Sequence, residues 1–341
     1  MPDAIYDDGP GSSVIVSGFS DEIAASKDID QQLSVISALG LDYCSLRFVS
    51  IAGGPVKNTV DLSNAELARV RDKLGEYGVR VSSLGSPIGK VKLLDQEDGS
   101  TNQFVPWPTY LGEHVRRACE VANELGTKLL RAFSFYHPKG TNAKQHISLA
   151  CERLAEIAEV VADYGLILGL EVEANLVGHT GTLLAEIYET VANPHLVLVF
   201  DGANLVTQGF TEGEVYEEYL AMKNGLGWIH VKDYRLAQSK RERDEYVDEE
   251  ALNQFVPVGV GDGAYGRVFA DLASNGKTIF DRCQALGLPG LFIDLEPHLK
   301  KGGQFGGFSG PAGFGIACRA LIDRLNAAGL RVTLRDWPLQ N

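Results

Sequence analysis

The stretch LGWIHVKDYR, Leu226 to Arg235, joins an apolar run to side chains of very different protonation chemistry. The run predicts a buried strand over 227–233 that ends in His230, Lys232 and Asp233. A strand buried in a core has no use for these groups. In an α/β barrel, however, the carboxyl ends of the strands carry the catalytic side chains, so the stretch points to a site at a barrel mouth.

Seven further apolar runs have the length and composition of strands, and amphipathic segments separate them. They cover residues 13–19, 41–48, 79–85, 127–135, 166–173, 196–201 and 290–296. Several of the intervening segments end in glycine just before the next strand, as in EYGVRV and DYGLIL, which is typical of a helix C-cap. Eight strands that alternate with helices predict parallel βαβ units.

An open doubly wound sheet satisfies the same alternation, but no GxGxxG follows the first strand and no GxxxxGK[ST] motif occurs. The strand count favours the closed form. The sequence therefore predicts an α/β fold with a single (β/α)8 TIM barrel over 14–341. We expect residues 1–13, which precede the barrel, to be a disordered lead-in. A Gly-rich loop at 300–315 follows strand eight, and it is either a flexible solvent loop or one that packs on a ligand.

Composition limits the classes of partner. The 341 residues include 45 acidic and 31 basic side chains, and the net charge of −14 repels nucleic acid. No apolar run reaches the roughly 18 to 20 residues of a membrane span. The N-terminus lacks the basic and apolar regions of a signal peptide, so we expect a cytoplasmic protein. Five cysteines without CxxC spacing predict reduced thiols in the core.

The last four predicted strands end in a set of side chains that would bind a cation. The set is Glu171 or Glu173, Asp201, His230 and Glu296. Three carboxylates and an imidazole at one barrel mouth are costly to desolvate without a positive charge. Mainly oxygen ligands with one nitrogen favour Mn²⁺, Mg²⁺ or Co²⁺ over Zn²⁺. Glu171 and Glu173 share a face of their strand, so spacing alone does not decide between them.

The chain resembles the sugar phosphate isomerase/epimerase family of xylose-isomerase-like TIM barrels from about Val14 to Leu325. The resemblance rests on GFSDEI, SLGSPIGK, LLRAFSFYHP, LEVEANLVGHTGT, FDGANL, HVKDYR, VPVGVGDGAYGRVF and DLEPHL, in that order. It implies one divalent metal, often Mn²⁺, with Glu171, Asp201, His230 and Glu296 as its ligands. Lys90 and Lys232 would then face the substrate, and His298 would flank the site.

One departure from the family pattern concerns the second strand. Relatives often have ELR at its end, whereas this chain has SLR, with Ser45 in place of the acid. An acidic role for this strand is therefore not expected. Arg47 is left as its substrate-binding candidate.

The resemblance implies isomerisation or epimerisation of a sugar through proton removal next to a carbonyl and an enediolate intermediate. Glu171 and Glu296 would act as base and acid, and Lys232 and Arg131 would stabilise the developing oxyanion. Glu173 would be a base, a support for a ligand or a substrate contact. The partner is a small-molecule sugar or derivative, phosphorylated or free. The oligomeric state stays open, a homo-oligomer included.

Three alternatives remain. A metal-dependent lyase or hydratase would eliminate the aglycone of a 3-keto-glycoside, with His137 as base or acid. A non-catalytic sugar-binding protein would not need so many acids and lysines around one site. An abasic-site endonuclease would need more histidine ligands and a positive surface, which the net charge of −14 disfavours.

Overall fold

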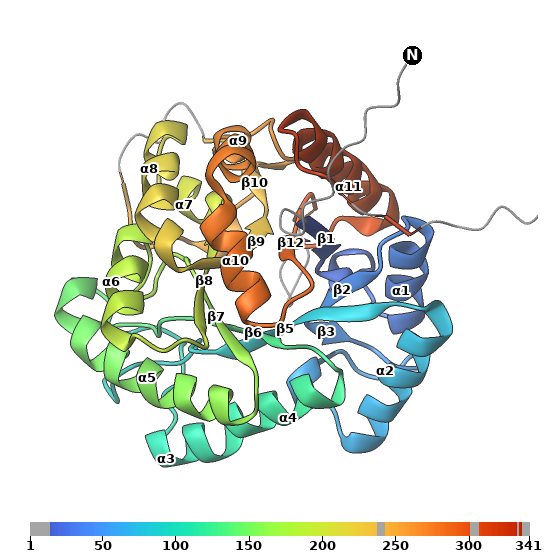
Figure 1. Cartoon of the computed structure of the whole chain (residues 1–341). Coiled ribbons are helices and arrows are strands. Elements are labelled where there is room, and N and C mark those ends of the chain that lie inside the picture. Colours follow the sequence, from blue (N-terminus) through green and yellow to red (C-terminus); the bar gives the residue numbers. More distant parts are fainter. Residues whose placement is uncertain (1–13, 237–242, 301–306, 333, 336–341) are drawn as a thin grey trace, which may run out of the picture.

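Eight parallel strands form the centre of the structure. The structure is a computed structural model, and it describes residues 14–236, 243–300, 307–332 and 334–335. The strands are β1 (Val14–Gly18), β2 (Tyr43–Leu46), β5 (Arg80–Ile88), β6 (Leu129–Ala132), β7 (Ile167–Glu171), β8 (Leu196–Asp201), β9 (Leu226–Val231) and β12 (Leu291–Leu295). They pair in the order β1-β12-β9-β8-β7-β6-β5-β2. A parallel bridge between Phe19 and Ser45 then links the two outer strands and closes the ring (Figure 1). Each predicted strand is present, and the predicted (β/α)8 barrel is confirmed.

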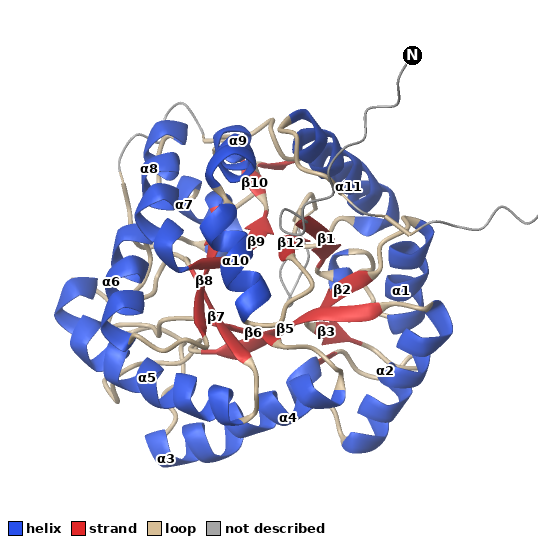
Figure 2. Ribbon diagram, viewed as in Figure 1, coloured by secondary structure: helices blue, strands red, loops and turns tan. Residues whose placement is uncertain are grey.

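Helices surround the strand ring on its outside (Figure 2). They are α1 (Ile29–Ala38), α2 (Asn64–Tyr77), α3 (Trp107–Thr109), α4 (Arg116–Glu124), α5 (Ile147–Asp163), α6 (Gly181–Val191), α7 (Gly202–Val206), α8 (Glu212–Met222), α9 (Tyr265–Asn275), α10 (Lys277–Ala285) and α11 (Gly310–Ala327). Their apolar faces pack on strands that are buried along nearly their whole length. The helices and the strand hydrogen bonds thus hold the carboxyl ends of the strands in a fixed ring.

Two short hairpins that the sequence did not predict extend from the barrel. Strands β3 (Phe48–Val49) and β4 (Lys57–Asn58) pair after β2, and β10 (Asp233–Tyr234) pairs with β11 (Phe255–Val256) after β9. Two-residue strands carry too little periodicity to be recognised in a sequence. Both hairpins lie in βα connections, which form the active-site end of such barrels.

The Gly-rich segment after β12 differs in part from its prediction. Residues 310–315 are not loop, because α11 already begins at Gly310. Pro311 suits the first turn of a helix, and Phe314 opens a buried face that offsets the low helix propensity of the glycines. Residues 301–306 of this segment and the predicted lead-in at 1–13 lie outside the described residues.

Other predictions from composition can be compared with the fold. All five cysteines are buried free thiols, as expected for core residues. Burial raises the pKa of Cys44 to about 12, which keeps this thiol protonated. Within the described ranges, no helix has both the length and the apolar character that crossing a bilayer requires.

Gly89 connects β5 to the barrel mouth at a point with no room for a side chain. Its φ is +85°, and a Cβ at this position would overlap the carbonyl oxygen of Phe133. The Gly89 amide also donates to the Tyr110 hydroxyl at 2.7 Å. This close packing brings the next residue, Lys90, to 4.5 Å from the centre of the Phe133 ring.

We expect Gly89→Ala to lower the free energy of unfolding by about 2 to 5 kcal/mol, because left-handed strain and overpacking add together. Gly99→Ala is the matched control, since Gly99 has φ +72° but a Cβ added to it would meet no atom within 4 Å. It should cost only about 1 to 2 kcal/mol. Urea denaturation of both variants measures the difference, and equal losses would show that the space around Gly89 is not limiting.

Candidate metal centre

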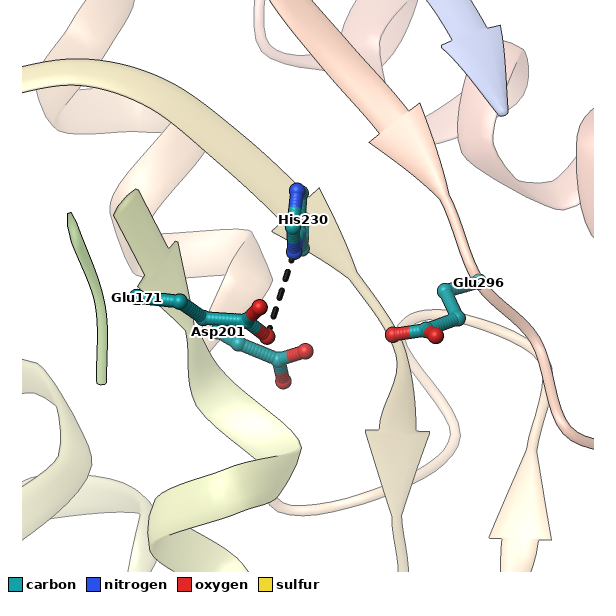
Figure 3. A group of neighbouring side chains, drawn as sticks. All are labelled: Glu171, Asp201, His230 and Glu296. Atoms are coloured by element: carbon teal, nitrogen blue, oxygen red, sulfur yellow. Dashed lines mark ion pairs between the residues drawn. The ribbon is translucent and has the colours of Figure 1, made fainter. Parts of the chain in front are cut away.

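Four side chains from consecutive barrel strands converge at the mouth. Glu171 and Asp201 are the last residues of β7 and β8, His230 lies near the end of β9, and Glu296 directly follows β12. One ligand atom of each lies within 4.8 Å of those of the other three. All four residues are at most 2% exposed. Figure 3 shows the carboxylates of Glu171 and Asp201 beneath the imidazole, with Glu296 facing them.

Several ligand-type atoms of this group have no hydrogen-bond partner among the described residues. They are Oε2 of Glu171, Oδ2 of Asp201 and both ring nitrogens of His230. Ion pairs partly compensate these atoms, since Nδ1 of His230 lies 3.2 Å from Oε1 of Glu171 (Figure 3) and Arg131 and Lys232 lie beside the two oxygens. Buried polar atoms are nearly always satisfied in proteins, so four such atoms in one cluster mark a candidate ligand site. Three carboxylates and one imidazole offer hard oxygen donors with a single nitrogen. This donor set fits a divalent cation such as Mn²⁺, Mg²⁺, Co²⁺ or Zn²⁺.

The structure places Glu171 in the cluster, whereas Glu173 forms an ion pair with Lys90 beside it. The two glutamates also differ in protonation. Burial favours the neutral form of Glu171, but His230 and Arg131 outweigh it and lower the pKa to about 2. Burial dominates at Glu173 and raises its pKa to about 7, although Lys90 opposes the shift. Glu171 is thus the stronger acid of the two, and it is the one more readily held as the anion that a metal requires.

Asp201 divides its two oxygens between a helix and the site. Oδ1 accepts the backbone N–H groups of Ala203 at 3.0 Å and Asn204 at 3.3 Å, which caps the N-terminus of α7. Oδ2 lies 3.4 Å from Nζ of Lys232. Burial raises the pKa of Asp201 to about 6, even though Lys232 acts in the opposite direction. The helix cap therefore fixes the carboxyl group with one oxygen directed to the cluster.

Two further contacts orient the ligands, and they come from residues without a predicted role. Asn204 donates its side-chain amide to Oε1 of Glu171 at 3.2 Å and to the Val172 carbonyl at 3.0 Å. The rings of Phe19 and Trp228 meet the His230 ring edge-on, with centroids 5.0 and 4.5 Å away. Asn204 lies three residues after Asp201 in FDGAN, within the first turn of a helix, which was the available signal.

The predicted cations compensate the carboxylates. Lys232 Nζ lies 3.3 Å from Glu296 Oε2, and Arg131 lies 3.5 Å from Glu171 Oε2. Arg47 pairs with Glu296. Burial opposes the charged form of Glu296, but Lys232 and Arg47 lower its pKa well below the usual range. These three cations let the carboxylates stay ionised in a dry environment.

A second acidic group lies next to the cluster, on the side of β1. His298 places Nδ1 2.6 Å from Oε1 of Glu22 and Nε2 3.6 Å from Oε1 of Glu296. Its backbone is left-handed, with φ 47°, and its N–H donates to Glu22 at 3.2 Å. Arg47 bonds to both Glu22 and the buried Asp21. Asp21 and Glu22 lie in the short 3-10 helix Ser20–Glu22 that follows β1 in GFSDEI, but neither was among the predicted site residues.

Two predicted or suspected residues serve other purposes. His137 is not brought into the cluster, because its ring contacts Thr141, His146 and Tyr246. Asp233 points away from the ligands, as strand alternation predicts, and accepts the backbone N–H groups of Gly259, Gly261 and Gly263 at 2.8 to 3.0 Å. It anchors the glycine-rich segment that precedes α9.

Comparison with known proteins identifies the fold family. Residues 33–281 match the family described as xylose isomerase-like TIM barrel. A search among proteins with curated descriptions gave no match.

Three similar solved structures share this fold. D-psicose 3-epimerase of Clostridium cellulolyticum H10 with D-tagatose is 12% identical, with TM-score 0.58 over 92% of this chain and 98% of that one. The IolI protein with a bound zinc atom is 13% identical, with TM-score 0.59 over 92% and 99%. A xylose isomerase-like TIM barrel protein of Mycobacterium smegmatis in complex with magnesium is 16% identical, with TM-score 0.58 over 95% and 99%.

We expect the purified chain to bind Mn²⁺, and Glu171→Gln to weaken this binding at least about 100-fold, since a buried ligand charge is lost. Glu173→Gln is the matched control two residues along the same chain, and it should change the affinity less than about threefold. Electron paramagnetic resonance of free Mn²⁺ during titration gives both values. A larger loss in Glu173→Gln would exchange the roles of the two glutamates.

Proposed function

Since the chain belongs to the xylose isomerase-like TIM barrel family, we propose that it is a divalent-metal-dependent isomerase or epimerase of an uncharged sugar. The observation that carries the proposal is the buried cluster of Glu171, Asp201, His230 and Glu296, whose ligand atoms lie within 4.8 Å of one another. A structural role alone does not explain it, because three buried carboxylates weaken a fold unless they bind something. Among the structures described above, the D-psicose 3-epimerase shares the fold and acts on a sugar.

A bound divalent ion supplies Lewis-acid polarisation of substrate oxygens and neutralises negative charge. The protein groups supply proton transfer. Glu171 and Glu296 extend from β7 and β12, which β8 and β9 separate in the ring, so the two carboxylates approach a sugar bound at the cluster from different directions. One carboxylate removes the proton from the carbon next to the carbonyl. If the proton returns to the former carbonyl carbon, the product is an isomer. If the other carboxylate delivers a proton to the original carbon from its opposite face, the product is an epimer.

Lys232 would stabilise the enediolate that proton removal leaves. Burial disfavours the ammonium form, but Asp201 and Glu296 outweigh it and raise the pKa of Lys232, so the side chain stays protonated. Its position between two of the cluster carboxylates puts the positive charge where an oxyanion would develop. Arg131, paired with Glu171, adds a second fixed positive charge at the same end of the barrel.

The charge balance favours a sugar without a phosphate group. Each predicted cation at the mouth already has a carboxylate partner. Lys90 pairs with Glu173, and Arg131 pairs with Glu171. Lys232 pairs with Asp201 and Glu296, and Arg47 pairs with Asp21, Glu22 and Glu296. A phosphate would have to displace one of these carboxylates, which would leave a buried anion without its partner. An uncharged sugar only needs hydrogen bonds.

Proton NMR in D₂O with Mg²⁺-loaded protein tests the proposal on a panel of ketoses and 3-keto-glycosides. We expect one C–H to exchange with solvent, and Lys232→Gln to slow this exchange about 10²- to 10³-fold while Mn²⁺ still binds. Lys277→Gln is the matched control, since the Lys277 side chain is 84% exposed and its ion pair within the described residues is with Asp281 of its own helix. It should leave the exchange rate unchanged.

Other results of this experiment would replace the proposal. Exchange accompanied by release of the aglycone would identify the elimination reaction that we named as the alternative. Absence of exchange on every sugar, with metal bound, would contradict catalysis and leave a sugar-binding protein.

A further inference from the structure

Residues 243–247, in the connection between β10 and β11, reach across the barrel mouth to the loops of other strands. The N–H of Asp244 donates to the carbonyl of Gln208, after β8, at 3.1 Å. The hydroxyl of Tyr246 accepts the N–H of Gly140, after β6, at 2.8 Å. Segment 243–247 is therefore held by loops outside its own βα unit, and the proposed reaction assigns it no role.

Asn175, after β7, contacts this segment with both its backbone and its side chain. Its N–H donates to the Glu245 carbonyl at 3.0 Å, and its side chain exchanges hydrogen bonds of 2.8 and 3.1 Å with the backbone of Val247. Within the segment, Val247 alone is buried. Hydrogen bonds more than apolar packing thus hold segment 243–247 in place, and such a loop opens locally at a low cost in free energy.

Gln208 connects this segment to the interior of the mouth. The residue is 1% exposed, and its Nε2 donates to the carbonyls of His179 at 2.9 Å and Asn204 at 2.7 Å. Because carbonyls only accept, these bonds fix the orientation of the amide, and Oε1 accepts the Nδ1–H of His179 at 2.9 Å. Nε2 of the same ring lies 3.5 Å from Oε2 of Glu245. Gln208 therefore holds the segment through its own carbonyl and through His179.

Asn204 completes the connection, because it contacts two of the four cluster residues. Its backbone N–H donates to Oδ1 of Asp201 at 3.3 Å, and its side-chain amide donates to Oε1 of Glu171 at 3.2 Å. The second oxygen of each carboxylate has no hydrogen-bond partner among the described residues. A cation and Asn204 would thus use different oxygens, and an ion at the cluster leaves the connection intact.

This arrangement links two equilibria, cation binding at the cluster and docking of segment 243–247. A cation that fixes the carboxylates of Glu171 and Asp201 also fixes Asn204, and an ordered Asn204 lowers the entropy that Gln208 and the segment lose on docking. Two events coupled in this way strengthen each other by the same factor, because a coupling free energy is reciprocal.

We propose that Gln208 is a positioning residue that couples the candidate metal centre to segment 243–247. A divalent ion at the cluster holds the segment against the mouth, and the docked segment in turn tightens the binding of the ion. The sugar therefore meets an ordered mouth only after the metal is bound. The inference rests on the metal site of the proposed function and not on the identity of the sugar.

Hydrogen–deuterium exchange of the full chain, followed by mass spectrometry with and without Mn²⁺, tests the coupling without catalysis. We expect Mn²⁺ to slow amide exchange in segment 243–247 at least about fivefold, the lower range for coupled sites. Exchange in α2, which lies across the ring from α7 in Figure 1, reports any general stabilisation by the metal.

Gln208→Met keeps the volume of the side chain and removes its hydrogen bonds. It should abolish the protection by Mn²⁺ and weaken Mn²⁺ binding about tenfold, as measured by electron paramagnetic resonance. Gln32→Met is the matched control, since Gln32 is also buried, donates to two carbonyls at 2.8 and 2.9 Å and accepts from the Ser20 hydroxyl at 2.6 Å. It should keep both the protection and the affinity.

Asn175→Gly tests the reciprocal direction and serves if Gln208→Met does not fold. Asn175 has φ 67°, which glycine adopts without strain, so the variant removes the bonds to Val247 and keeps the backbone. It should weaken Mn²⁺ binding by about the factor of the wild-type protection.

The results separate the two proposals. Mn²⁺ binding to wild-type protein without slower exchange in segment 243–247 would overturn the coupling and leave the metal centre. The coupling is also overturned if Gln208→Met and Gln32→Met behave alike, or if Asn175→Gly binds Mn²⁺ as tightly as wild-type protein. Absence of Mn²⁺ binding to wild-type protein would contradict the metal centre itself, and the coupling with it.

Discussion

The burial of three carboxylates within a few ångströms of one another is the constraint on which the rest of the site depends. Ionised acids in a dry environment repel each other, and each loses its hydration. The chain offsets this cost with Lys232, Arg47 and Arg131, one cation from each of three different strand ends. Among the described residues, the His230 ring and Oδ2 of Asp201 form ion pairs with Glu171 and Lys232 but no hydrogen bond. A divalent ion is the further partner that we propose for them.

The barrel explains why much of this could be predicted from the sequence. Parallel strands place their carboxyl ends in one ring, so four polar residues at four strand ends had to converge once the fold was recognised. Asp201 and His230 are even paired in register on neighbouring strands. Contacts that depend on side-chain reach across the ring could not be predicted in this way. Arg47 pairs with Asp21 and Glu296, which are 26 and 249 positions away in the sequence, and no local sequence pattern indicates either partner.

Loops set the other limit of prediction. His137 follows β6 closely enough to be placed at the mouth, but the direction of its ring depends on Thr141 and on Tyr246, over a hundred residues later in the chain. The start of α11 at Gly310 depends on the burial of Phe314, which outweighs the glycine content that suggested a loop. In both cases tertiary packing decides between local conformations that the sequence leaves nearly equal.

Strands and loops therefore contribute different parts of the proposed chemistry. The strand ends supply a charge arrangement that any proton transfer next to a carbonyl can use, which is why the fold by itself does not identify a substrate. Identity must come from the loops, whose lengths and contacts differ without disturbing the barrel. Here the loops are joined to one another by the Asn175–Val247 and Tyr246–Gly140 hydrogen bonds around an acidic, partly aromatic space.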